Sequence, residues 1–463
     1  MANAGKDYLL EYDAAPEAEK YPLVQGWIRS EPLPFFKQLR AERPVLQTPI
    51  CTLVASFTDV RDMLQMPKIF TVDLYKPKMG VTGPDDGYLM AHDDDALHYR
   101  EKSLMQGLLN RNDLPRVRKM IAETAKKILG EAGGNIELVN EYCRMVPVHL
   151  VQDYFGLDGI DREHLIEWSY WNQYDAFNNQ PFDMLSDREY SQIVERHDET
   201  SEELVVYIAV LMARKLVRLK IMNAIYMLLN PVQKLIYRVL GMALPERHDD
   251  MVTRMLRSKF AKQVDFPLTR VGVNAGGLLI GAIETTSQAV AQVVEYFIDN
   301  PALLKKAKDK ARQDDTPAFD AMVWEALRFV PIRPDIFRQA ASDYTIAKDT
   351  EHETEIKAGT IVRLLTHSAM FDPYAYENPD EFIPGRNFYH NFALGFGAHQ
   401  CMGKYVGMEM IPEMVRQVVL LDDLKSDGKI SYRNRLFPDR DGPFPDEYKL
   451  KWLERTATTA DAS

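Results

Sequence analysis

The chain has 463 residues, of which 46% are hydrophobic, so it is long enough to bury a large core. Its formal net charge of -12 argues against broad binding to nucleic acid or to anionic lipid, although a local basic face is compatible with that total. Three cysteines form an odd and sparse set, and the N-terminal residues lack the pattern of a secretion signal or a transit peptide, so we expect a cytoplasmic protein.

Helical periodicity dominates the sequence, and strand-like runs are short. No linker or internal repeat divides the chain. We therefore predict a mainly α protein with small β-sheets (an α+β fold), built as one large domain over residues 1–455 with a disordered tail at 456–463. In chain order, the strand candidates are 45–47, 52–56, 344–346 and 360–364, and the clearest helical patterns are 31–42, 115–132, 271–297, 301–312, 319–329 and 404–420.

Residues 204–240 combine many aliphatic side chains with charges that are almost all basic. Because cations recur in every window of about 20 residues, a continuous membrane span is improbable. A pair of long amphipathic core helices, interrupted at Pro231, is the plainer interpretation. The other is a basic amphipathic surface that rests on a membrane and admits a lipophilic substrate.

The most informative stretch is 391–403, Asn-Phe-Ala-Leu-Gly-Phe-Gly-Ala-His-Gln-Cys-Met-Gly, which a helical pattern follows. Gly395 and Gly397 allow a tight turn close to a flat cofactor, and Gly403 lets the next helix begin near it. Cys401 would meet free amide groups and the positive end of that helix, which favour the thiolate form that binds iron. A buried cysteine by itself is more often a small hydrophobic residue.

These residues resemble the signature loop of the cytochrome P450 family, Phe-Gly-x-Gly-x-His/Arg-x-Cys-x-Gly. The match includes His399, whereas Leu394 stands where the family usually has phenylalanine. The resemblance implies a heme b cofactor with Cys401 as the axial ligand of the heme iron. It also implies a P450-type fold that holds the heme between the long helix at 271–297 and the helix after the cysteine loop.

Two elements near the cysteine loop resemble further family motifs. Glu325 and Arg328 match its Glu-x-x-Arg helix, and Arg386 ends a sequence that matches Phe-x-Pro-x-Arg. The spacing of the first pair alone would indicate a surface ion pair of little energetic weight. The resemblance instead implies a buried structural triad of Glu325, Arg328 and Arg386 that fixes the scaffold around the heme.

The sequence Gly281-Ala-Ile-Glu-Thr-Thr286 lies inside the long apolar helix and resembles the oxygen-binding pattern of the family, with Ala282 at a usual glycine. Glycine and threonine weaken a helix locally, which predicts an opening for dioxygen. Cleavage of the O–O bond needs protons at one oxygen only. Thr285 is therefore expected to hydrogen-bond dioxygen, and Glu284 to connect it to solvent.

A third group of residues is expected to bind the heme propionates. These are Arg338, which follows the Glu-x-x-Arg helix, His399 in the cysteine loop, and His98 and Lys102, which resemble a His-x-x-x-Arg element. Lys102 replaces the usual arginine, so it would act as a point charge with less geometric control.

The resemblance, which covers about residues 31 to 450, implies a monooxygenase that inserts one oxygen atom from O2 into a hydrophobic molecule by hydroxylation or epoxidation. The apolar segments 79–90 and 332–337 and the helix around Gly281 are expected to line the substrate pocket, which suggests a fatty acid, terpenoid or steroid. No flavin or iron–sulfur segment is visible, so electrons are expected from a separate ferredoxin-like donor with its reductase. Its docking residues would be Arg111, Arg116, Arg118, Lys119 and Lys404.

Two other interpretations stay open. One is a peroxide-using or hydroperoxide-rearranging heme-thiolate enzyme, and the other is a heme-binding sensor or carrier without turnover. The acid and alcohol at Glu284 and Thr285 speak against both, because neither function needs a proton relay.

Overall fold

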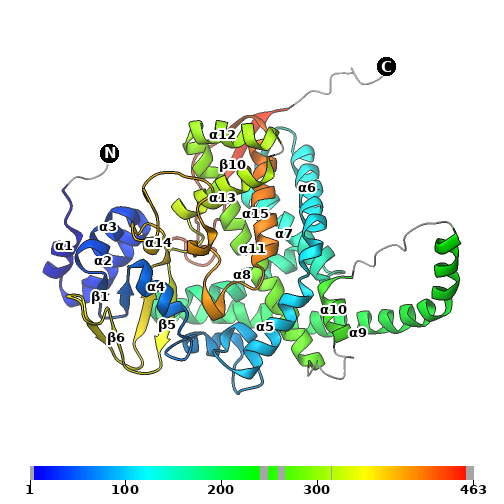
Figure 1. Cartoon of the computed structure of the whole chain (residues 1–463), viewed down its shortest axis with the longest axis horizontal. Coiled ribbons are helices and arrows are strands. Elements are labelled where there is room, and N and C mark those ends of the chain that lie inside the picture. The colour runs from blue at the N-terminus through cyan, green and yellow to red at the C-terminus, as the bar shows by residue number, and fades with distance from the viewer. Residues whose placement is uncertain (1–4, 240–248, 259–265, 314, 455–463) are drawn as a thin grey trace.

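The structure is a computed structural model that describes residues 5–239, 249–258, 266–313 and 315–454, with side chains for all of these except 225–239. A helical body makes up most of it, and the N-terminal helices pack with a small sheet on one side (Figure 1). The predicted mainly α fold with small sheets is confirmed. The tail predicted at 456–463 lies outside the described residues.

The helices of the described chain begin and end close to the predicted patterns, because each pattern marks the face that the helix buries. They are α1 (Tyr8–Ala14), α2 (Glu17–Ser30), α3 (Pro32–Glu42), α4 (Phe57–Leu64), α5 (Ala96–Leu108), α6 (Leu114–Glu131), α7 (Met145–Leu150), α8 (Arg162–Asn178), α9 (Asp187–Val239), α10 (Met251–Ser258), α11 (Leu268–Asp299), α12 (Pro301–Arg312), α13 (Thr316–Phe329), α14 (Thr366–Ala369) and α15 (Lys404–Val419).

The largest sheet has the strand order β1-β2-β8-β5-β3, in which only the β2–β8 pair is parallel. A second sheet has the order β4-β10-β9, and β6 pairs with β7. The strands are β1 (Val45–Gln47), β2 (Thr52–Val54), β3 (Phe70–Thr71), β4 (Asn135–Glu137), β5 (Ile336–Ala340), β6 (Tyr344–Ile346), β7 (Thr354–Ile356), β8 (Ile361–Leu364), β9 (Asp422–Ser426) and β10 (Lys449–Leu453).

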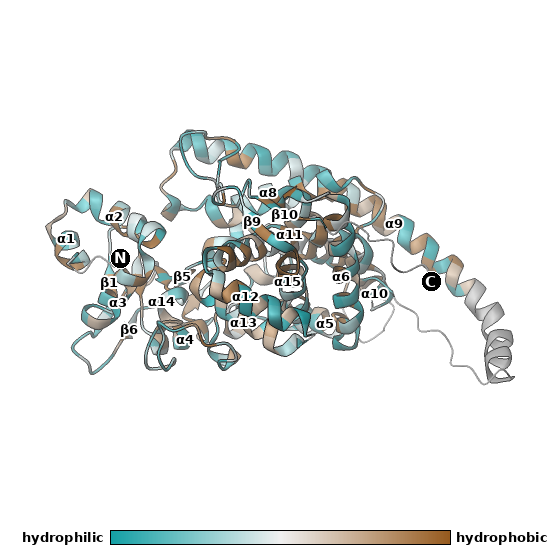
Figure 2. Ribbon diagram, turned by 90° about the horizontal axis from the view of Figure 1, so that it is seen from above, coloured by the Kyte–Doolittle hydropathy of each residue, from teal (hydrophilic) through white to brown (hydrophobic). Residues whose placement is uncertain are grey.

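Helix α11 runs through the centre of the body, where it packs against α8, α13 and α15 (Figures 1 and 2). Most of its residues are buried and apolar, which is the pattern of a helix enclosed on nearly all sides. Arg270 and Asn274 are exceptions, and both bind the buried carboxylate of Glu101 on α5, at distances of 2.5 to 2.8 Å. This ion pair joins α5 to α11 near the cysteine loop.

Helix α9 is one continuous helix that packs against the body at first and then extends away from it (Figure 1). The prediction of two helices interrupted at Pro231 is therefore wrong; the last residue of that segment, Leu240, lies outside the described residues. Leu204, Ile208 and Leu211 are buried against the body. Among the described helices, none is long and apolar enough to cross a membrane.

Candidate active site

The cysteine loop is held in a tight turn before α15. Gly395 and Gly397 have φ angles of 70° and 69°, in the left-handed region that favours glycine. A Cβ atom on Gly397 would lie 2.3 Å from the backbone oxygen of Leu64, so only glycine fits there. The Cys401 N–H donates to the Leu394 carbonyl oxygen at 2.9 Å, which closes the turn. Leu394 itself packs half-buried against the core.

Cys401 is exposed to a cleft of about 230 Å³ that Arg111, Lys404 and Tyr405 also line. Although the residue has exposed surface at this cleft, desolvation of its sulfur by the surrounding atoms raises the pKa of the thiol, while the Gly403 N–H, Lys102 and Lys404 act to lower it. The Gly403 N–H thus acts in the direction expected from the helix terminus, while desolvation acts against it. A metal that takes this sulfur as a ligand would itself displace the thiol proton.

The middle of α11 is open next to Gly281. This residue is exposed, and a Cβ atom on it would meet no atom within 4 Å. The Thr285 hydroxyl donates to the Gly281 carbonyl oxygen at 2.9 Å, and the preceding carbonyl, that of Ile280, accepts hydrogen bonds from Ser169 and Gln173 of α8. Side chains thus engage two successive carbonyl groups at this point, as expected for a locally loosened turn.

Glu284 lies where no solvent reaches it. Its carboxylate is 0% exposed and accepts hydrogen bonds from the Arg144 guanidinium at 2.8 to 3.1 Å. The same guanidinium donates to the Pro445 carbonyl oxygen at 2.9 Å. The expectation that Glu284 connects Thr285 to solvent is therefore wrong for this structure, because Arg144 already satisfies the carboxylate in a buried ion pair.

Four of the predicted heme-binding side chains gather beside the cysteine loop, and we call them the donor cluster: Arg338, His399, His98 and Lys102. Arg338 is 4% exposed, its guanidinium donates to the Phe337 carbonyl oxygen, and no described carboxylate forms an ion pair with it. The Nδ1 atom of His399 is buried without a hydrogen-bond partner among the described residues. A buried guanidinium without a carboxylate fits a site for anionic groups.

The other two members of the donor cluster hold backbone groups. The His98 ring nitrogens lie 2.9 Å from the Leu89 carbonyl oxygen and 3.1 Å from that of Ala398. Lys102 donates to the carbonyl oxygens of Ala398 and Gln400, and burial lowers its pKa to about 8. The structure thus gives His98 and Lys102 the role of tying α5 to the cysteine loop, and leaves His98 no free ring nitrogen for a propionate.

The predicted triad forms one buried network. The Glu325 carboxylate lies 2.8 Å from Arg328 and 3.2 Å from Arg386, and it also accepts the Ile383 N–H at 3.0 Å. Arg328 is 1% exposed and donates further to carbonyl oxygens of the segment that precedes the cysteine loop. The network thereby joins α13 to that segment.

The predicted docking residues divide into two groups. Arg118 is largely buried and binds the carboxylates of Asp320, Glu409 and Glu413 at 2.7 to 3.1 Å, so its assignment to a docking face is wrong. Arg111 lies over the Tyr405 ring at the cleft beside Cys401, and Lys404 lies at the same cleft. Arg116 and Lys119 have acidic neighbours on α6 or just before it, at 3.8 Å.

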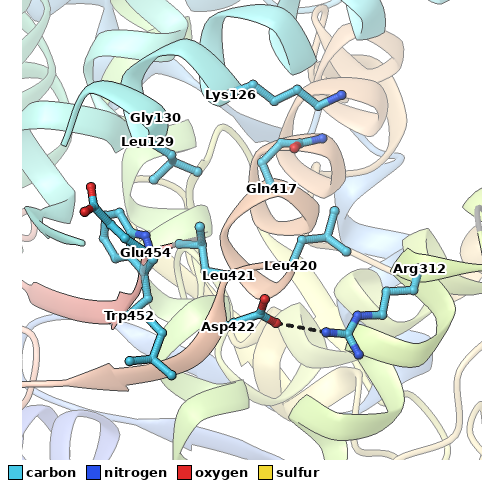
Figure 3. A pocket seen from close by; sticks show the side chains of 11 residues that line it. Lys126, Leu129, Gly130, Arg312, Gln417, Leu420, Leu421, Asp422, Trp452 and Glu454 are labelled. Atoms are coloured by element: carbon cyan, nitrogen blue, oxygen red, sulfur yellow. Dashed lines mark hydrogen bonds and ion pairs between the residues drawn. The ribbon is translucent and has the colours of Figure 1, made fainter. Parts of the chain in front are cut away.

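Two site residues were missed from the sequence. Arg144 carries no motif, because its partner lies 140 positions away on another helix. Asp93 contacts His399, with 3.2 Å between its Oδ1 and the His399 Nε2 atom, and a short acidic run at 93–95 gave no reason to select it. A larger cleft of about 490 Å³ lies at the far end of α15 from Cys401, where Arg312 pairs with Asp422 (Figure 3), and no predicted site residue lines it.

Comparison with known proteins agrees with this arrangement. The model of the family "Cytochrome P450" matches residues 173–420, more than half of the chain. Pulcherriminic acid synthase of Bacillus subtilis (strain 168) is 24% identical, over 86% of this chain and 90% of the relative. Cyclomarin C epoxidase of Salinispora arenicola is also 24% identical, over 80% and 83%.

Among solved structures, that of CYP109E1 from Bacillus megaterium in complex with testosterone superposes with a TM-score of 0.69 at 17% identity, covering 92% of this chain and 98% of the other. That likeness shows the fold. Together with the family match and the order of the elements around the cysteine loop, it leads to one conclusion: the chain belongs to the cytochrome P450 family of heme b oxygenases.

Proposed function

We propose that this chain is a monooxygenase that inserts one oxygen atom from O2 into a hydrophobic small molecule, with Cys401 as the axial ligand of the heme iron. The observation that supports the proposal is the glycine turn before α15, which holds Cys401 beside the buried Arg338 and His399, while Gly281 leaves an open position in the middle of α11. The Tyr88 ring packs on α11 at Gly277, one turn before Gly281; burial, and after it the charge of Cys401, raises its pKa, which supports a position of the thiol near this part of α11.

The side chains around this space fit a heme. Arg338 offers donors without a carboxylate ion pair among the described residues, and the Nδ1 atom of His399 is a ring nitrogen without a hydrogen-bond partner there; both suit the propionates. The absent Cβ at Gly281 leaves room on the opposite side. When bound, the heme supplies the iron centre at which dioxygen is reductively activated. We also propose that the described residues form a single domain around it.

Within this site, Thr285 is the residue that we propose to handle protons. Its hydroxyl proton is directed to the Gly281 carbonyl oxygen, so the lone pairs of Oγ1 can accept a hydrogen bond from a water molecule in the open space. The Glu284 side chain is buried, and its ion pair with Arg144 fixes the conformation of this turn of α11. We therefore assign Glu284 a positioning role and Thr285 the catalytic one.

Replacing Thr285 by valine should lower the amount of product formed per O2 consumed by about tenfold or more, because the isosteric side chain cannot relay a proton. Oxygen uptake, peroxide release and product should be measured together. Thr286→Val is the matched control, since Thr286 is 4% exposed on the same helix, and it should leave the coupling unchanged. Equal coupling in the two variants would contradict the assignment.

We propose that electrons come from a separate ferredoxin-like protein with its reductase, which docks at the Cys401 cleft near Arg111 and Lys404. Turnover with reduced ferredoxin and O2 should exceed turnover with peroxide. The rate should also fall as the salt concentration rises, because salt screens exposed charges. Turnover with peroxide alone, insensitive to salt, would favour the peroxide-using alternative, and a protein that forms no product under either condition would favour a sensor or carrier.

The substrate class that we propose is a hydrophobic molecule such as a fatty acid, terpenoid or steroid. The segments expected to line the pocket contribute Tyr88, Met90 and Ile332, which are half-buried and pack against the main core. The structural neighbour CYP109E1 was solved in complex with testosterone, which belongs to this class. A spectral binding screen of such compounds against the ferric protein, followed by product analysis, tests the class.

We further propose peripheral contact of α9 with a membrane surface. Val206 and Val210 are 65% and 62% exposed, and Val217 and Ile221 continue the same face of the helix. Arg218 and Lys220 lie next to this face and are exposed. An apolar stripe flanked by cations is the pattern of a helix that lies in a lipid interface. Flotation with anionic vesicles should carry the protein upwards, and its absence there would remove the proposal.

A further inference from the structure

Asp93 is a carboxylate placed against the donor cluster that the proposed function does not use. It lies after the short helix η2 (Leu89–Ala91), and its Oδ1 atom is 3.2 Å from the His399 Nε2 atom. Both of its oxygens accept the Val72 N–H, at 3.0 and 3.2 Å. It is also the acid that acts electrostatically on the buried Arg338 guanidinium. Asp93 therefore stands where the donor cluster would receive anionic groups.

Charged and titratable groups face Asp93 from three sides. Burial raises its pKa to about 6, and the neighbouring Asp73 carboxylate adds to this effect. The Val72 N–H, Lys76 and Arg338 act to lower the pKa and do not offset the burial. His399 contacts the carboxylate directly, with His98 behind it at a ring separation of 4.9 Å and Lys102 beyond.

A bound heme would add two propionate carboxylates to the same donors. The number of carboxyl groups beside Arg338 would rise from one to three, and each added negative charge favours the protonated form of its neighbour. Resting on the proposed heme site, we propose that Asp93 is a third carboxyl group of the propionate site, and that heme binding by this chain takes up one proton at Asp93.

His399 gives this proton a structural consequence. A neutral imidazole ring carries a single N–H, and in His399 the Nε2 atom is the one that faces Asp93. With Asp93 ionised, that N–H lies on Nε2 and points to the carboxylate. With Asp93 protonated, the acid donates to Nε2 and the ring proton moves to Nδ1, the atom that has no partner among the described residues. Proton uptake at Asp93 thus turns His399 into a donor for a propionate.

The pH dependence follows from the two states of Asp93. Below pH about 6 the carboxyl group is already protonated in the heme-free protein, so heme binding takes up no proton. Above that pH each binding event needs a proton, and the affinity falls as pH rises until the higher pKa of the heme-bound form is passed. The thiol of Cys401 would have the opposite dependence, because binding of a metal by its sulfur releases the thiol proton to solvent. Comparing wild type with Asp93→Asn separates the pH dependence of Asp93 from that of Cys401, because Cys401 is present in both proteins.

The test measures the rate of heme transfer from the holoprotein to excess apomyoglobin between pH about 5.5 and 8. Wild type and Asp93→Asn should lose heme at similar rates at the lowest pH. At the highest pH wild type should lose it about tenfold faster, which corresponds to one unit of pKa change on binding. Asp94→Asn is the matched control, because Asp94 pairs with Lys68 on the surface, and it should follow wild type. A ratio between wild type and Asp93→Asn that does not change with pH would overturn the proposal.

Heme dimethyl ester, which lacks the propionate carboxylates, provides the second arm. With this ester, the pH-dependent difference in the rate of heme loss between wild type and Asp93→Asn should disappear. If the difference persisted, Asp93 would act by stabilising the fold, and the proposal would be overturned. If Asp93→Asn retains no heme, a second measurement on the wild-type apoprotein replaces the comparison of variants. At pH about 7, the number of protons taken up on binding hemin should exceed the number taken up on binding the ester by up to about one. Equal uptake would overturn the proposal. Neither assay needs turnover or a particular iron ligand, so failure here is distinct from failure of the Cys401 assignment.

Discussion

Cys401→Ser should abolish the absorption signature of a thiolate ligand in the reduced carbon monoxide complex, and should lower monooxygenase turnover by at least about a thousandfold. That loss corresponds to about 4 kcal/mol in activation free energy. The reason is that a serine hydroxyl does not supply the electron density by which a thiolate favours O–O cleavage. The donor cluster is left intact in the variant, so some heme should remain bound and the spectrum can be recorded.

Cys51→Ser is the matched control for this experiment. Cys51 is 2% exposed in the N-terminal core, and burial raises the pKa of its thiol to about 11. The Cys51→Ser variant should therefore have the same spectrum and the same turnover as wild type. A thiolate signature that survives in Cys401→Ser, or a purified protein that contains no heme, would refute the assignment of the ligand.

Glu325→Ala should destabilise the protein by about 3 to 5 kcal/mol, the usual result of removing one partner from a buried ion pair. Arg328 is 1% exposed and would keep its charge without a carboxylate beside it, and the Ile383 N–H would lose its acceptor. Denaturant unfolding of the holoprotein, followed by both tryptophan fluorescence and heme absorption, measures the loss.

Glu123→Ala is the control for the stability measurement. Its partner Lys119 lies 3.8 Å away on the same helix, and both side chains are more than 60% exposed, so this pair should contribute little. If Glu325→Ala lost no more stability than this control, the triad would not be a structural element of the fold.

The order of the motifs predicted the family and the main helices because each depends on local sequence. The helix bounds of α3, α6, α11 and α15 follow from apolar periodicity that the buried faces require. Gly397 was selected for the same kind of reason, and the Leu64 backbone shows why no other residue fits. These features depend on residues that are only a few positions apart, so they can be predicted from the sequence.

The wrong expectations concern partners that are distant in the sequence. Nothing near Glu284 indicates that Arg144 binds it, and nothing near Arg118 indicates its three carboxylates. Likewise, Pro231 predicts a break, while α9 continues through it.

The Arg144 guanidinium connects two parts of the protein that are far apart in the sequence. It links the Glu284 carboxylate in the middle of the long central helix with the carbonyl group of Pro445, only a few residues before the last strand. Because a guanidinium is planar and its donors have fixed directions, a shift of that late segment would change the angle at which the arginine meets the acid. Truncation or tagging near the C-terminal strand would thus alter the turn of α11 that contains Glu284 and Thr285, far along the polypeptide from the changed residues.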